Sequence, residues 1–224
     1  MTARDVVDAL VPEGRPRLRG WLHLGALPVA AALGVALVAA APNGRGALAA
    51  AIYASAVVGL FAASALYHRG RFRPDVSAWL RRVDHSMIYV LIAGTYTPIC
   101  LLVLDDRTGT TLLVLVWSGA LAGAFLELLP WSTPRWLSVA VYLALGWAAV
   151  VAVPQLVEAV GVVASLLALL GGLFYTAGAI VYGLRRPDPA PRVFGYHEVF
   201  HGFTLAAAAA HYALIAFWVL PAAA

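Results

Sequence analysis

Two histidines, His197 and His201, stand four residues apart near the end of the chain. In a helix this spacing puts both imidazoles on one face about one turn apart, a common way for one helix to offer two ligands to a metal ion. The pair alone is weak evidence, because histidines at helix ends are often interfacial side chains that reach for water. Its meaning depends on which other residues the helices bring to the same place.

The composition predicts an integral membrane protein. Of the 224 residues, 62% are hydrophobic and 12% are charged, whereas an ordinary soluble domain is about half apolar and a quarter charged. A helix needs about 20 apolar residues to cross the hydrocarbon core, and lipid accepts only helices or closed barrels, which satisfy every backbone polar group internally. No apolar run alternates with period two, which disfavours a barrel.

We therefore expect an all-α bundle of seven transmembrane helices. The apolar runs span residues 22–41, 46–67, 85–104, 110–129, 136–153, 159–184 and 198–220, with turn-forming or helix-ending residues between them. A short cytoplasmic segment, residues 1–21, precedes a single transmembrane domain, residues 22–224. Between the second and third runs, apolar residues at near-helical spacing suit either a short interfacial helix or a plain basic loop. These are Phe72, Val76, Trp79, Leu80 and Val83.

The arginines predict the orientation of the bundle. All fifteen basic residues are arginine, and all but Arg45 and Arg107 lie in the N-terminal segment or in the second, fourth and sixth loops. Because basic residues accumulate in cytoplasmic loops, we expect a cytoplasmic N-terminus, an outside C-terminus and a multi-pass protein of the inner (plasma) membrane. The same distribution explains the net charge of +4 without a nucleic-acid partner.

This topology places four polar residues at one depth. The second helix ends, and the third and seventh begin, at the cytoplasmic face, so His68, Asp84, His197 and His201 lie at the same level. Ionisable groups inside membrane runs cost several kcal/mol unless they meet a partner, a metal or water, so each is a functional candidate. His68 would add a third nitrogen to the histidine pair, and three protein ligands with one open position are typical of catalytic zinc.

Other polar residues receive different interpretations. Ser64 precedes His68 by four residues and could orient a ligand, a metal-bound water or a substrate carbonyl, and Asp84 could accept a proton from metal-bound water. His211 lies about 15 Å deeper than His201 by helical rise, so we expect it to line the interior. The remaining candidates are expected to be boundary carboxylates (Glu127 and Glu198), interfacial histidines (His23 and His85) or packing tyrosines (Tyr67, Tyr89 and Tyr96).

Three motifs together resemble the bacterial hemolysin III family, relatives of the adiponectin and progestin receptors and, more distantly, of the alkaline ceramidases. They are Ser64-x-x-x-His68, the segment Asp84-His85-Ser86-x-Ile88-Tyr89-x-x-Ile92-Ala93-Gly94-Thr95-Tyr96-Thr97-Pro98, and His197-Glu198-x-x-His201 followed by His211. The resemblance implies a zinc ion held by His68, His197 and His201, with Asp84 close through water. Only about twenty residues precede the first run, which departs from the receptors and argues against ligand sensing of their kind.

The leading hypothesis is a zinc-dependent hydrolase of a lipid amide or ester. Zinc would polarise the scissile carbonyl and activate water, with Asp84 as general base and Ser64 at the oxyanion. The alternative is a non-enzymatic regulator of membrane state, or a pore-forming haemolytic protein, in which zinc only fastens helices together. A channel or transporter ranks third, because no run is broken at its centre by a Pro or Gly pair. Membrane lipid is the expected partner, and the sequence predicts no oligomeric state.

Overall fold

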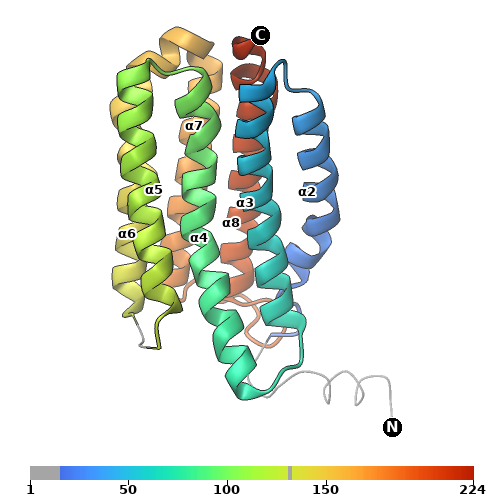
Figure 1. Ribbon diagram of the computed structural model, residues 1–224. Coiled ribbons are helices and arrows are strands. Elements are labelled where there is room, and N and C mark those ends of the chain that lie inside the picture. The colour runs from blue at the N-terminus through green and yellow to red at the C-terminus, as the bar shows by residue number, and fades with distance from the viewer. Residues whose placement is uncertain (1–15, 131–132) are drawn as a thin grey trace.

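The computed structural model describes residues 16–130 and 133–224, and this part of the chain folds into helices joined by short connections (Figure 1). It contains no strand, and Ala190 and Phe194 form an isolated bridge. The helices are α2 (Trp21–Ala39), α3 (Gly44–Arg69), α4 (Pro74–Leu102), α5 (Asp106–Leu128), α6 (Arg135–Trp147), α7 (Val153–Leu184) and α8 (Tyr196–Leu214). The all-α prediction is confirmed, while most of the predicted N-terminal segment, residues 1–21, lies outside the described residues.

Six helical stretches of the described residues are long and apolar enough to cross a membrane. The count differs from the seven predicted runs at one place, because the runs at 136–153 and 159–184 are joined in one stretch of 50 residues, Arg135–Leu184. Within it, a 3-10 segment (Ala148–Ala152) links α6 to α7, and the backbone leaves helical geometry at Gly161. The two ends of this stretch meet, since Arg135 Nη1 donates a hydrogen bond to the Tyr182 carbonyl at 3.3 Å.

Helix α4 begins earlier than predicted. It starts at Pro74 and runs without interruption to Leu102, so the segment expected as an interfacial helix or a basic loop is the first part of a spanning helix. Proline suits the first helical turn because its missing N–H is one that the helix leaves unbonded, and Asp75 adds favourable negative charge there. Its start projects beyond the neighbouring helices in Figure 1.

The helices form a bundle in which sequence neighbours pack side by side, and α2 also packs against α8 (Figure 1). A main cluster of buried side chains joins α2, α3, α4 and α8, and includes Leu37, Tyr53, Leu60, Leu91 and Ala208. Many large apolar side chains face outward, as expected where the surrounding solvent is lipid. The buried surface therefore lies between the helices, which is where polar side chains can meet.

Tyr96 on α4 fixes the end of α6 instead of only packing. Its hydroxyl accepts a hydrogen bond from the Ala149 N–H at 2.7 Å. The same hydroxyl lies 2.7 Å from the Gly146 carbonyl and 2.9 Å from the Leu145 carbonyl, to which it can donate. These bonds partner backbone groups that the change from α-helix to 3-10 helix leaves exposed.

Candidate metal centre

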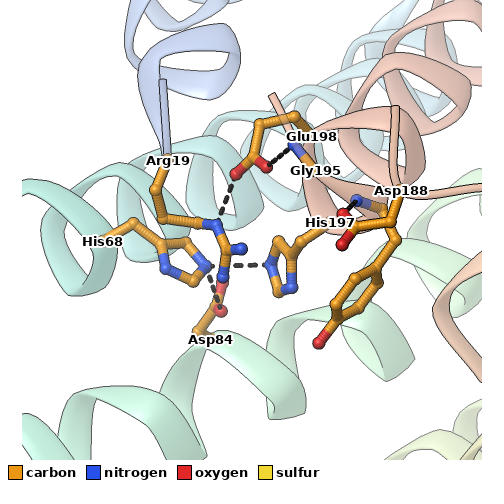
Figure 2. A network of polar contacts seen from close by, with 8 residues as sticks. Arg19, His68, Asp84, Asp188, Gly195, His197 and Glu198 are labelled. Atoms are coloured by element: carbon orange, nitrogen blue, oxygen red, sulfur yellow. Dashed lines mark hydrogen bonds and ion pairs between the residues drawn. The ribbon is translucent and has the colours of Figure 1, made fainter. Parts of the chain in front are cut away.

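The three histidines predicted as ligands lie together and are buried. His68 ends α3, while His197 and His201 lie in the first two turns of α8. One ligand atom from each residue lies within 4.8 Å of the other two, and the Nε2 atoms of His68 and His197 are 3.2 Å apart (Figure 2). Residues 129 positions apart in the chain thus bring their imidazoles to one point.

The donor set fits a zinc ion. Zinc binds imidazole nitrogen at about 2.0–2.1 Å, so two nitrogens sharing one ion lie roughly 3.3 Å apart in tetrahedral geometry, near the 3.2 Å between His68 and His197. The ligand atoms of all three histidines lie within 4.8 Å of one another. Neutral imidazole presents a lone pair, and a nearby carboxylate at Asp84 balances part of a cation's charge.

Asp84 and Ser64 lie beside this group. Asp84 is in the third turn of α4, with its Oδ2 3.6 Å from His68 Nε2 (Figure 2). That distance is too long for a direct hydrogen bond and suits a contact through water. Ser64 lies one turn before His68, and its buried hydroxyl oxygen makes no hydrogen bond with a described residue. Both residues line the same cavity as His197 and His201.

The chain before α2 closes one side of the site. The N–H groups of Arg17 and Leu18 donate hydrogen bonds to the carbonyls of Arg192 and Val193, each at 3.0 Å. Gly20 follows with φ of 79°, and a Cβ added there would lie 2.6 Å from His68 Cβ. Glycine is therefore required at this position for two reasons. It allows the left-handed backbone, and it lets α3, which carries His68, approach closely.

The burial of Glu198 contradicts a prediction. It was expected to be a boundary carboxylate near headgroups, but its side chain is fully buried. One carboxylate oxygen pairs with the Arg19 guanidinium, and the other accepts a hydrogen bond from the Gly195 N–H at 2.7 Å (Figure 2). The second contact is the glutamate half of a capping box at the start of α8, since the N-cap residue Gly195 has no side chain to return a bond. A buried carboxylate is tolerated here because it is both paired and hydrogen-bonded.

His23 is also buried, so its assignment as an interfacial residue is wrong. Its ring stacks on that of His201 with centroids 3.9 Å apart, and its other side faces Phe61 at 4.8 Å. Neither ring nitrogen makes a hydrogen bond with a described residue. His23 belongs to α2 and lines the same cavity, and its ring is stacked between Phe61 of α3 and His201 of α8.

Glu127 and His85 form a second polar group outside the histidine site. The Ser138 hydroxyl donates a hydrogen bond to Glu127 Oε1 at 2.7 Å, and His85 Nδ1 lies 3.8 Å from Glu127 Oε2. Glu127 was expected to be a boundary carboxylate and His85 to face the interface. Glu127 lies in the last turn of α5, and the two residues face each other and join α4, α5 and α6 at this end of the bundle.

A cavity of about 510 Å³ extends from the histidine site into the bundle. Its lining is mainly apolar and comes from helices α2 to α8, and His211 lies far along it from His201. The prediction that His211 lines the interior between helices is confirmed. The arrangement combines a three-histidine site, a carboxylate and a hydroxyl with an apolar space large enough for a lipid chain.

These features define a multi-pass membrane protein with a buried site that could hold a metal ion. Residues 13–212 match the family model described as haemolysin-III related, so the chain belongs to this family and the resemblance is confirmed. It is 32% identical over 204 residues to Hemolysin-3 of Bacillus cereus, covering 89% of each chain. It is 38% identical over 139 residues to the Hemolysin-3 homolog of Bacillus subtilis (strain 168), a match that spans 62% of either protein.

Proposed function

We propose that the protein is a zinc-dependent hydrolase of a lipid amide or ester. The observation that carries this proposal is the placement of three buried imidazoles, Asp84 and Ser64 at one end of a long apolar cavity. A lipid whose chain fills the cavity would present its carbonyl to the polar end. His68, His197 and His201 would hold the ion, which supplies Lewis-acid polarisation of the carbonyl when it is bound.

The residues beside the ligands have separate tasks. Asp84 acts as general base, and its Oδ2 accepts a proton from the attacking water. Its 3.6 Å separation from His68 Nε2 is compatible with this role, because Asp84 is not directly hydrogen-bonded to the ligand. The buried Ser64 hydroxyl, which lies beside the Asp84 carboxylate, donates a hydrogen bond to the oxygen on which negative charge develops. The proton on Asp84 then passes to the leaving amine or alcohol.

We further propose that the stretch Arg135–Leu184 crosses the membrane twice, giving seven spans. Fifty residues of helix would be about 75 Å long, far more than one crossing needs, and the bond from Arg135 to Tyr182 brings its ends together. With the arginine distribution, this topology supports a cytoplasmic N-terminus, an outside C-terminus and a place in the inner (plasma) membrane, with the histidine site near the cytoplasmic face.

Metal analysis and turnover of the unchanged protein and three purified variants test the hydrolase. We expect the unchanged protein to carry about one zinc per chain and to hydrolyse at least one member of a panel of ceramides, N-acylethanolamines and phospholipids. His197→Ala should lose zinc and turnover together. Asp84→Asn should keep zinc and lose roughly 10²–10⁴ in rate. His85→Ala, a histidine outside the ligand set, is the control that should keep zinc.

Two outcomes would overturn the proposal. Turnover that survives removal of zinc would exclude the metal from the reaction. A large fall in thermal stability with chelator, together with no hydrolysis of any lipid on the panel, would instead identify zinc as a structural link between α3 and α8.

A further inference from the structure

The cavity contains a second polar point far from the histidine site. Among the described residues that line it, buried polar atoms without a hydrogen-bond partner fall into two groups. His23, Ser64 and His201 belong to the site already described. The others are the Tyr175 hydroxyl on α7 and the Nδ1 atom of His211 on α8, whose rings lie 5.7 Å apart.

The two side chains offer complementary hydrogen-bonding groups. His211 Nε2 lies 3.2 Å from the Ala168 carbonyl, a contact in which a neutral imidazole must donate, and this leaves Nδ1 as an acceptor. The Tyr175 hydroxyl can donate. A ligand hydroxyl placed between them would give its proton to His211 Nδ1 and accept one from Tyr175, so both buried groups would be satisfied.

The chain holds the His211 ring at this point by leaving space for it. A Cβ added at Gly171 would lie 2.2 Å from His211 Nε2. Two other hydroxyls of the lining are bonded to backbone carbonyls: Ser165 donates to Gly161 and Thr176 to Gly172. The unpartnered pair is therefore distinct from the rest of the lining in this part of the cavity.

The position of the pair along the cavity selects a kind of lipid. His211 is ten residues after His201 on α8, which corresponds to about 15 Å of helical rise. An extended chain advances roughly 1.2 Å per bond, taken from the length of an extended residue with its three backbone bonds. The pair thus lies about a dozen bonds from a carbonyl at the histidine site, with apolar residues such as Ile88, Ile92 and Ala179 in the lining.

We propose that Tyr175 and His211 bind a hydroxyl group in the middle of an acyl chain, so that the protein selects lipids with a hydroxylated chain. The position assigned to the carbonyl rests on the proposed hydrolase function. The hydroxyl site itself rests on the two unpartnered groups and the apolar cavity around them. An unsubstituted chain would leave both groups buried without a partner, which costs binding energy.

Binding of three fatty acids to the purified protein in lipid nanodiscs tests this proposal. The probes are 12-hydroxystearate, 2-hydroxystearate and stearate, each competing with a fluorescent fatty acid. We expect 12-hydroxystearate to bind at least about fivefold more tightly than the other two, the value of one net hydrogen bond. Tyr175→Phe and His211→Leu should each remove most of this preference. Tyr53→Phe is the control, because its hydroxyl bonds to the Ala208 carbonyl and does not line this cavity.

The results that would refute the hydroxyl site differ from those that would refute the hydrolase proposal. Equal binding of the three fatty acids, or a preference that persists in Tyr175→Phe/His211→Leu, would refute the hydroxyl site. Variants that lose thermal stability while chain preference stays unchanged would show that the pair binds an ordered water instead. The same measurement on His197→Ala separates the two proposals, since the mid-chain preference should remain when zinc and turnover are lost.

Discussion

Replacing Gly20 by alanine tests whether the turn before α2 holds α3, the helix that carries His68, in place. The backbone there has φ of 79°, and the new methyl group would lie 2.6 Å from His68 Cβ. A left-handed conformation costs a non-glycine residue about 1–2 kcal/mol, and forcing an extra carbon into a packed site costs about 1–3 kcal/mol. The expected total is roughly 2–5 kcal/mol.

Thermal unfolding and elemental analysis of the purified variant would measure this effect. For a chain of this size each kcal/mol shifts the midpoint by about 2–4 °C, so Gly20→Ala should unfold roughly 4–20 °C below the unchanged protein. Because relief of the overlap moves His68, zinc content should also fall. Gly25→Ala is the matched control: no atom lies within 4 Å of the added Cβ, and alanine is the better helix former by about 0.5–1 kcal/mol.

The reasoning would be wrong if Gly20→Ala kept both its midpoint and its zinc. Loss of stability with full zinc occupancy would be a partial failure, because it would show that the turn and the ligand His68 are mechanically independent. Equal losses in Gly20→Ala and Gly25→Ala would show that α2 tolerates no added methyl group, and would remove the link to the site.

Two further predictions concern charged groups at opposite ends of the bundle. Arg19→Met should destabilise the protein by about 3–5 kcal/mol because Glu198 stays buried without its cation, and a double-mutant cycle with Glu198→Met should recover much of that loss; additive losses would contradict it. Asp105 accepts hydrogen bonds from the N–H groups of Thr108 and Arg107, which lower its pKa. This stabilisation is present above the ordinary pKa of about 3.9 and is lost as the pH falls through the lowered value. The unfolding midpoint of the unchanged protein should therefore fall more steeply with acid than that of Asp105→Ala. Parallel plots of midpoint against pH would refute a stabilising role for Asp105 at the start of α5.

The close approach of the three ligand histidines was predictable because the depth of a residue in the membrane follows from its position along an apolar run. Apolar runs mark where each helix enters and leaves the bilayer, so a residue's level follows from its place in a run. His68 ends one run, while His197 and His201 begin another at the same face. The structure brings these imidazoles within 4.8 Å of one another.

The rotation of each helix was harder to predict. The run 22–41 is apolar on all sides, so no pattern marks which face is buried, and the stacking of His23 on His201 could not be read from it. The burial of Glu198 did leave a signal. Glutamate three residues after Gly195, just before an apolar run, is the spacing of a capping box.

The early start of α4 and the joined α6 and α7 have different causes. Pro74 and Asp75 are typical of a helix start, and the apolar residues after them continue the period of the following run. The arginines among them are typical of a cytoplasmic loop, which hides this periodicity. Between α6 and α7 the chain stays helical past Pro154, because proline is accepted in the first turn of a helix.

The separation of 129 residues between His68 and His197 has a consequence for synthesis of the protein. Ribosomes elongate at about 5–20 residues per second, so His197 is made roughly 6–26 s after His68. The backbone pairing of Arg17 and Leu18 with the loop before α8 joins residues still further apart in the chain and waits longer. The three-histidine site is therefore completed only when α8 inserts. A nascent chain that stops before α8 carries His68 without the other two ligands.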